Sequence, residues 1–216
     1  MSLVIALASG KVALMAGDRR SITFLGSCQQ LEEELYSGEI RDEEELLARA
    51  KALKATLQVS DGRQKVWRKG DLLVGEVTEI SRCRQRRRRV YVAPGAYLLV
   101  DVEGERAEII GKGLSGLVIL GNRFAQSISR DKVREAKGRV DEKLLRAIFE
   151  EAGQRTPSVS LEYDLLSTKA KPQDPQSRKD LQSLKDPLSL RDTQSSLLQA
   201  LEEDARKSGW KRCARQ

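Results

Sequence analysis

The chain has 216 residues and contains no histidine. This absence excludes nucleophilic triads and dyads whose base is an imidazole, and it removes the ligand that most catalytic zinc and haem sites use. An enzyme with this sequence must therefore take its general base from a carboxylate, a lysine or the terminal amine.

Cysteine is also scarce, and the three residues present are far apart, at Cys28, Cys83 and Cys213. Without a Cys-x-x-Cys pair, neither a metal-binding knuckle nor a disulfide scaffold is expected, and the spacing suits a reducing cytosol. We therefore expect no metal and no cofactor.

Long apolar runs are missing too. None approaches the roughly 18 residues that a membrane-spanning helix needs. The first residues also lack a basic segment and the pattern of a cleavable signal. These features predict a cytoplasmic protein that does not insert into a membrane.

Aromatic residues make up only 4% of the chain, although the net charge is +7. Much of the positive excess lies in the arginine-rich run of residues 82–89, whereas residues 31–46 are rich in acid. With so few aromatic side chains for base stacking, we do not expect nucleic-acid binding. Strand patterns flank the run, which predicts a solvated hairpin tip. The alternatives are a patch for RNA or an acidic partner, or attraction of an acidic peptide substrate through Arg87 and Arg89.

What is present is a series of short elements. Two apolar runs, residues 3–8 and 12–16, flank a turn and predict a β-hairpin covered on both faces. An insertion over about residues 27–58 carries leucines at helical spacing among acidic residues, and predicts two short amphipathic helices. Further strands are expected over residues 22–25, 56–59, 65–68, 72–80, 90–92, 97–102, 107–110 and 159–166. Further helices are expected over residues 123–137 and 141–152. Because strands and helices do not alternate one to one, the pattern predicts an α+β fold rather than a doubly wound sheet.

The composition changes after about residue 168 to Lys, Gln, Asp, Ser and Pro. We therefore divide the chain into a domain over residues 1–168 and a polar, largely flexible C-terminal tail over residues 169–216. Only residues 194–207 of the tail show a helical pattern. Few apolar residues lie in it, so we expect it to stay outside the core.

The first hairpin carries the candidate chemistry. If its turn centres near Gly10, antiparallel partners have numbers that sum to about twenty, so Ser2 lies opposite Asp18. Removal of Met1 leaves Ser2 with a hydroxyl nucleophile and an amine base whose reference pKa is roughly 7.7–8.0. A lysine that tunes the hydroxyl and a backbone donor for the oxyanion would complete the site. The alternatives are that Asp18 forms a surface ion pair with the arginines after it, and that Lys65 protects a sheet edge.

The order of these residues resembles the start of a mature proteasome β subunit. Ser2, the apolar hairpin and the segment Gly17-Asp18-Arg19-Arg20 stand at the spacing at which that family has its N-terminal threonine and Asp-x-Arg. The segment from Lys65 to Gly75 is similar to the strand with the family's catalytic lysine and the turn that leads to its oxyanion glycine. The insertion separates the two parts.

Further segments make the sequence similar to connectase, an archaeal protein ligase of methanogens that is related to proteasome β subunits. They are the insertion with its residues 33–38 and 42–44, the arginine-rich run before Val90-Tyr91, Gly121-Asn122-Arg123-Phe124 and Thr156-Pro157-Ser158-Val159-Ser160. The resemblance covers about residues 1–168. It implies a four-layer αββα sandwich of the N-terminal-nucleophile (Ntn) hydrolase superfamily, proteasome β-like, with a helical insertion.

The resemblance also implies roles for individual residues. Ser2 is the nucleophile, and Lys65 lowers the pKa of its hydroxyl. Asp18 holds Lys65 charged and oriented, and Arg20 packs against the pair. The backbone N–H of Gly75 stabilises the oxyanion, and loss of one such donor typically costs about 3–4 kcal/mol of transition-state stabilisation.

Two departures from the proteasomal pattern stand out. The first is serine in place of threonine, whose methyl group restricts χ1. The second is the missing aspartate near the start of the last strand, which binds the terminal amine in that family. Ser158 and Ser160 are the candidates left for that contact.

The function implied is peptide acyl transfer, as in a protein ligase or transpeptidase. An acyl-enzyme forms on Ser2 and passes to an N-terminal amine instead of water. The implied substrate is a Lys-Asp-Pro-Gly-Ala-like segment, as in the methyltransferase complex of methanogens, cut between Asp and Pro. We expect a monomer. The alternatives are an Ntn peptidase or amidohydrolase, and a catalytically weak proteasome-like module that binds RNA or an acidic partner.

Overall fold

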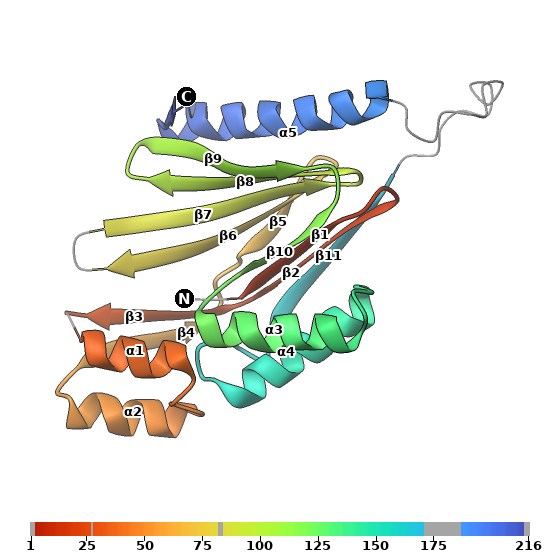
Figure 1. The fold of residues 1–216 in the computed structure, drawn as a ribbon. Helices are drawn as coiled ribbons and strands as arrows, with labels where there is room; N and C mark the ends of the chain where they lie inside the picture. Colours follow the sequence, from red (N-terminus) through yellow and green to blue (C-terminus); the bar gives the residue numbers. More distant parts are fainter. Residues whose placement is uncertain (1–2, 27, 82–83, 171–186, 214–216) are drawn as a thin grey trace.

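Two β-sheets lie face to face in the computed structural model, which describes residues 3–26, 28–81, 84–170 and 187–213 (Figure 1). The four-stranded sheet has the order β10-β1-β2-β11, and the six-stranded sheet has the order β12-β9-β8-β7-β6-β5. The strands of the first are β1 (Val4–Ala8), β2 (Val12–Asp18), β10 (Gly116–Leu120) and β11 (Tyr163–Lys169). Those of the second are β5 (Val66–Lys69), β6 (Leu72–Ser81), β7 (Arg84–Ala93), β8 (Ala96–Glu103), β9 (Arg106–Gly113) and β12 (Lys211–Cys213).

Helices cover the outer faces of both sheets. On the four-stranded sheet these are α3 (Arg123–Glu135) and α4 (Glu142–Arg155), whose positions match the two helices predicted there. The side chains of Asn122 and Asp141 cap them by accepting from the N–H groups three residues on. On the six-stranded sheet the cover is α5 (Pro187–Ser208). The predicted α+β mixture of strands and helices is confirmed, and the strand pairs are antiparallel except that of β12 with β9.

Buried apolar side chains form one core between each pair of neighbouring layers. β1 and β2 contribute to two of them, because alternate residues of a strand point to opposite faces. Leu3 and Ile5 face α3 and α4, whereas Val4 and Ala6 face the six-stranded sheet. This explains why both strands read as continuous apolar runs, and it confirms the prediction of a hairpin covered on both faces.

The insert, defined here as residues 20–61, forms a small layer of its own. It consists of β3 (Arg20–Leu25), α1 (Gln29–Ser37), α2 (Glu43–Ala52) and β4 (Thr56–Asp61), with β3 and β4 paired as a two-stranded sheet. Its small core is closed by leucines of both helices and by apolar residues of the strands. The two predicted helices are confirmed, but the limits of 27–58 were too narrow because β3 and β4 belong to the same unit.

The C-terminal region corrects the prediction of a largely flexible tail outside the core. Leu197, Ala200, Leu201 and Ala205 of α5 are buried against the six-stranded sheet together with Trp210. β12 then adds a parallel edge strand beside β9. The domain therefore includes α5, Trp210 and β12, whereas residues 171–186 of the predicted tail lie outside the described residues. None of the helices in the described ranges is long and apolar enough to cross a membrane.

Candidate active site

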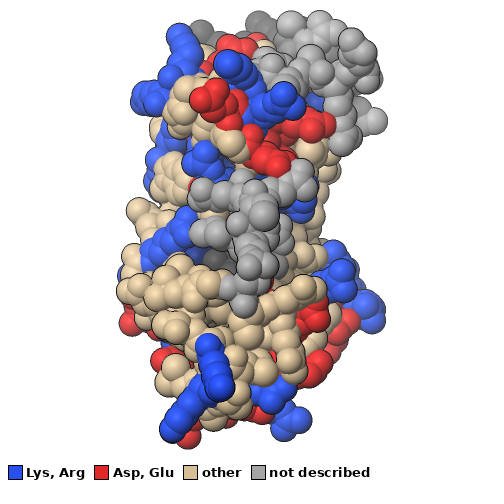
Figure 2. All heavy atoms as spheres, turned by 90° about the vertical axis from the view of Figure 1, so that its left-hand side faces the viewer, with Lys and Arg blue, Asp and Glu red and all other residues tan. Residues whose placement is uncertain are grey.

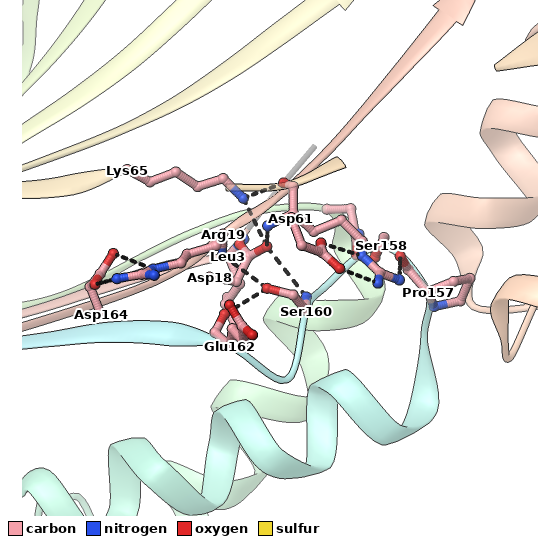
Figure 3. A network of polar contacts seen from close by, with 12 residues as sticks. Leu3, Asp18, Arg19, Asp61, Lys65, Pro157, Ser158, Ser160, Glu162 and Asp164 are labelled. Carbon is pink, nitrogen blue, oxygen red and sulfur yellow. Dashed lines mark hydrogen bonds and ion pairs between the residues drawn. The ribbon is translucent and has the colours of Figure 1, made fainter. Parts of the chain in front are cut away.

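A buried ion pair joins the ends of two strands from different sheets. Asp18 is the last residue of β2, and Lys65 directly precedes β5. The Lys65 Nζ lies 2.8 Å from the Asp18 Oδ2, and the two side chains are 2% and 0% exposed. Figure 3 shows the lysine side chain reaching from the edge of the six-stranded sheet to the carboxylate. This is the pairing that the sequence predicted.

Backbone N–H groups complete the surroundings of the Asp18 carboxylate. Its Oδ1 accepts from the Leu3 N–H at 2.7 Å, and its Oδ2 accepts from the Arg20 N–H at 2.9 Å. The Ser160 N–H lies 3.5 Å from the same Oδ2. A carboxylate that accepts charge-assisted hydrogen bonds on both oxygens is held in one orientation.

The register of the first hairpin differs by one residue from the prediction. Val4 pairs with Gly17, so partner numbers sum to 21 and Leu3 stands next to Asp18. The turn therefore centres between Gly10 and Lys11. Ser2 itself lies outside the described residues, so its role as the nucleophile stays a prediction.

The lysine is positioned by its backbone as well as by Asp18. The Lys65 carbonyl accepts from the Glu76 N–H at 2.8 Å, which fixes the start of β5 against β6. The Lys65 Nζ also donates to the Arg20 carbonyl at 2.5 Å. With two acceptors in place, the ammonium group has one donor left for a third partner.

Burial dominates the protonation of this lysine. It lowers the pKa of Lys65 from 10.5 to about 8, and the attraction of Asp18 opposes this change. A pKa of about 8 leaves most of the Lys65 population protonated at pH 7. Lys65 is therefore mostly charged at neutral pH and loses its charge as the pH rises through about 8.

Arg20 contributes to the site in a way that differs from simple packing. Its carbonyl accepts from Lys65, whereas its guanidinium forms a bidentate pair with Asp61 at 2.6 and 2.7 Å. The same group lies 3.1 Å from a Glu43 carboxylate oxygen and donates to the Pro157 carbonyl at 3.2 Å. These contacts raise the pKa of Arg20. The residue therefore ties the insert to the site.

Gly75, the expected oxyanion donor, lies inside the six-stranded sheet. The N–H of Glu76 points toward β5, because it donates to Lys65. Successive N–H groups of a strand point to opposite sides, so the N–H of Gly75 points toward β7 and into the sheet. A Cβ on Gly75 would lie 2.8 Å from Val4 Cγ1. Gly75 thus allows the two sheets to approach, and the geometry does not support it as an open donor to an oxyanion.

The two candidate serines lie in the connection between α4 and β11. Ser160 reaches the site, because its Oγ accepts from the Arg19 N–H at 2.9 Å and donates to the Glu162 carbonyl at 2.6 Å. Ser158 is fully buried and accepts from the Asn122 side chain at 2.7 Å. Of the two, Ser160 is the one whose own atoms contact residues next to Asp18.

Arg19 is the residue that sequence reasoning missed. Its N–H donates to Ser160 Oγ and to the Glu162 carbonyl, and its carbonyl accepts from the N–H groups of Gly62 and Arg63 at 3.1 and 3.0 Å. It therefore holds the loop before Lys65 against the loop before β11. These contacts are made by the backbone of Arg19, so any residue at this position could form them. Only its position next to Asp18 in the sequence could have indicated that it belongs to the site.

Comparison with known proteins identifies the family of the chain. A family model described as "Connectase MJ0548-like, N-terminal domain" matches residues 1–187. The chain belongs to this family. No curated protein matches. The crystal structure of eukaryotic HslV from Trypanosoma brucei is similar at 12% identity with a TM-score of 0.42, covering 78% of this chain and 99% of that chain. A likeness at that level supports no conclusion about fold or activity.

The region matched by the connectase model ends where α5 begins. Arg87 and Arg89, considered above for substrate binding, face this helix. Arg89 is buried, donates to Asp204 of α5 at 2.6 Å, and stacks with Arg87 on the Trp210 ring at 4.8 and 4.9 Å. Both arginines therefore lie on the outer face of the six-stranded sheet, beneath α5, whereas β2, which ends in Asp18, packs on the inner face. Their role as substrate ligands is not supported.

The expected solvated hairpin tip is likewise corrected over the part of the run that is described. Arg86, Arg88 and Arg89 lie in β7 and pair with carboxylates of the neighbouring strands, Asp101 and Glu76. On the face in Figure 2, basic side chains are interspersed with acidic ones. In the described ranges, no group of three or more Cys, Asp or Glu residues converges as a metal site would require.

Proposed function

We propose that this connectase-family chain is an N-terminal-nucleophile peptide acyl transferase. The observation that carries the proposal is that Asp18 binds both the Leu3 N–H and the Lys65 ammonium group. This brings the second residue of a processed chain and a buried cation to one carboxylate. The layer order of helices, sheet, sheet and helix supports the corresponding Ntn-hydrolase fold.

The chemistry begins with removal of Met1, which the small side chain of Ser2 favours. The Ser2 hydroxyl attacks a peptide carbonyl carbon, and its proton passes to the free α-amine. Lys65, as an ammonium, favours the alkoxide and lowers the pKa of the hydroxyl. The carbon–nitrogen bond then breaks, the leaving amine takes the proton, and an ester to Ser2 remains.

The second half of the reaction decides between ligation and hydrolysis. An N-terminal amine attacks the ester, a new peptide bond forms, and the Ser2 hydroxyl regains its proton. We propose an amine in preference to water. The proposed substrate is a Lys-Asp-Pro-Gly-Ala-like segment, as in the methyltransferase complex of methanogens, with proline's secondary amine as the acceptor. The protein would act as a cytoplasmic monomer.

Intact-mass measurement tests the nucleophile. The processed protein, incubated with a Lys-Asp-Pro-Gly-Ala peptide, should gain the mass of the acyl fragment, and Ser2→Ala should gain none. Ser60→Ala, which changes an exposed serine of β4, should form the adduct normally. A variant with residues added before Ser2 should be inactive, because its α-amine is an amide. An adduct on Ser2→Ala would rule out the assignment.

The same mixture distinguishes ligation from hydrolysis. Addition of a second peptide that begins with Pro-Gly-Ala should give a joined product. If only the free acid accumulates, the chain is a peptidase or amidohydrolase instead of a ligase.

A further inference from the structure

Gly17 directly precedes Asp18 in β2 and lies on the face of that strand toward the six-stranded sheet. Met15 packs into the core between the two sheets, and alternate residues of a strand share a face. The φ of Gly17 is not in the left-handed region, so its backbone does not require a glycine. A glycine inside a strand weakens the strand and often marks a place where another segment approaches closely.

The segment that approaches Gly17 is the start of β5. A Cβ on Gly17 would lie 2.8 Å from Val66 Cγ1, 3.3 Å from Val4 Cγ2 and 3.5 Å from Lys65 Cβ. Val66 directly follows Lys65, and Val4 is the first residue of β1. The missing side chain therefore lies where the first strand of the chain and the segment of Lys65 come together.

The space at Gly17 is too small for a methyl group. Carbon atoms in ordinary contact lie about 3.5–4.0 Å apart, so a Cβ at this position would have to displace Val66 by about 1 Å. Val66 is fully buried between the sheets, and branching at its Cβ restricts its rotamers. The collision would therefore be relieved by a movement of β5, and Lys65 would move with it.

The contacts of Lys65 leave little room for such a movement. Its Nζ lies 2.8 Å from Asp18 Oδ2 and 2.5 Å from the Arg20 carbonyl oxygen. Hydrogen bonds of this kind have lengths of about 2.7–3.2 Å, so an increase of about 1 Å would break them. The side chain already reaches toward Asp18 (Figure 3) and is 2% exposed, so it is enclosed by its neighbours.

We propose that Gly17 is a positioning residue for Lys65. The absence of a side chain at this place in β2 lets β5 come close enough for the ammonium group to bind Asp18 and the Arg20 carbonyl together. The inference rests on the proposed function, and Gly17 acts through Lys65 instead of on the peptide.

Gly17→Ala tests the inference. With a Lys-Asp-Pro-Gly-Ala peptide, the maximal rate of acyl-enzyme formation should fall about 10- to 100-fold, as expected for a displacement of about 1 Å. The peptide concentration that gives half of this rate should change little. The pH of the maximal rate should also decrease, because Lys65 loses the carboxylate that opposes the effect of burial on its pKa. Intact mass of quenched samples from pH 6 to 10 measures all three quantities.

A matched glycine in the same sheet provides the control. Gly116 in β10 pairs with Ala8, at the other end of β1, and a Cβ there would lie 2.9 Å from Tyr97 Cε1. Gly116→Ala should therefore lower the free energy of unfolding in urea by an amount similar to that of Gly17→Ala. It should keep the normal rate and pH profile, because the collision does not involve β5.

A second substitution should restore the position of Lys65. Val66→Ala removes the Cγ atom that the new methyl group would meet. Gly17→Ala/Val66→Ala should thus form the acyl-enzyme within about threefold of the rate of Val66→Ala alone, as expected when the collision is the only coupling. Circular dichroism shows which variants fold, and this comparison also decides the matter if Gly17→Ala alone does not fold.

Three outcomes overturn the inference while leaving the proposed function in place. One is a normal rate and pH profile for folded Gly17→Ala, and another is an equal loss of rate in Gly116→Ala. The third is a double variant that remains far slower than Val66→Ala. If the unmodified protein forms no acyl-enzyme, the proposed function fails first, and the inference falls with it.

Discussion

At the scale of single residues, two opposed effects act on the protonation of Lys65, whose side chain is almost completely buried. Loss of solvation favours the neutral amine, and the Asp18 carboxylate at 2.8 Å favours the ammonium. Removing one partner of a buried pair leaves the other charge uncompensated, which is far more destabilising than losing an exposed pair. The pair therefore has to be tested with variants whose folding is checked.

Lys65→Ala is expected to lower the rate of acyl-enzyme formation by roughly 10²- to 10⁴-fold, a range typical for loss of a group that assists proton transfer. Lys65→Arg should not restore it, because a planar guanidinium cannot replace a compact ammonium between Asp18 and the Arg20 carbonyl. The measurement is the intact mass of samples quenched at successive times, with circular dichroism to show that each variant is folded.

Lys51→Ala, at an exposed position of α2, provides the control and should react at the normal rate. Normal turnover by Lys65→Ala would show that another lysine, or none, takes part.

The pH dependence of acylation should be bell-shaped with a maximum near pH 8. The α-amine has to be neutral to act as a base, so the rate rises as pH passes its reference pKa of roughly 7.7–8.0. Lys65 has to be protonated, so the rate falls as pH rises through its pKa of about 8. The measurement is kcat/KM from pH 6 to 10, and a rate that keeps rising to pH 10 would contradict the role of the ammonium.

The pairing of Asp18 with Lys65 could be expected from the sequence only through the family resemblance. The hairpin pattern alone placed Asp18 at the end of a strand, but it did not indicate which lysine would meet it. Gly75 could not be judged in this way. The direction of its N–H depends on which neighbouring strand each residue faces, and a shift of one residue reverses it. The pairing of Arg89 depended on a helix that the sequence placed outside the fold.

At the scale of elements, the insert is fixed to the rest of the molecule at two points. One is Arg20, whose guanidinium donates to the Pro157 carbonyl and whose own carbonyl accepts from Lys65. The other is the end of α1, where Gly38 adopts a φ of +87° and an added Cβ would lie 2.4 Å from Phe124 of α3. The second contact can be tested without changing the site.

Gly38→Ala should destabilise the protein more than Gly26→Ala. Both glycines have positive φ, at +87° and +106°, so each substitution carries a backbone penalty of roughly 1–2 kcal/mol. Only at Gly38 would the new Cβ also collide with an aromatic ring, since nothing lies within 4 Å at Gly26. Urea unfolding of the two variants measures the difference in their free energy of unfolding. Equal losses of stability would show that α1 does not pack tightly against α3.

The helices of the insert were predictable because each buries a set of leucines at helical spacing among acidic residues. For α5, a helical pattern was predicted over residues 194–207, but its packing on the six-stranded sheet was not, because its apolar stripe is narrow. Leu197, Leu201 and Ala205 alternate with Gln, Glu, Asp, Arg and Lys, and the preceding residues have the composition of a linker. What holds α5 includes polar contacts across the layers, such as Lys69 with Asp204 at 2.5 Å. Such pairings leave no periodic pattern in the sequence from which the packing of α5 could be predicted.

At the scale of the whole molecule, α5 provides the outer cover of the six-stranded sheet. The apolar side chains beneath it come from β6, β7, β8 and β9, and Tyr91 is the largest of them. Its hydroxyl donates to Asp204 at 2.8 Å, and burial raises its pKa. Without α5, this face and this hydroxyl group would be in water.

Deletion of residues 187–216 should therefore cause aggregation or loss of cooperative unfolding, because an apolar face of this size is not compatible with a stable monomer. Deletion of residues 214–216 alone should have little effect. The measurements are binding of a hydrophobic dye, elution on size exclusion and thermal unfolding. A soluble, cooperatively unfolding fragment ending at residue 186 would show that α5 is dispensable for the fold.

A milder substitution gives a quantitative version of the same test. Leu201→Ala should cost about 2–5 kcal/mol of unfolding free energy, as buried leucines do, whereas the exposed Arg206→Ala should cost much less. Equal effects would mean that α5 does not pack as described.

The place of α5 near the end of the chain also has a consequence for synthesis on the ribosome. The strands that it covers are complete by residue 113, whereas Trp210, the last buried residue of their outer core, is translated about a hundred residues later. At roughly 5–20 residues per second, the nascent chain spends several seconds with that face bare. Stop codons or frameshifts in the codons for residues 187–210 would thus release a polypeptide with a bare sheet face that is prone to association and proteolysis.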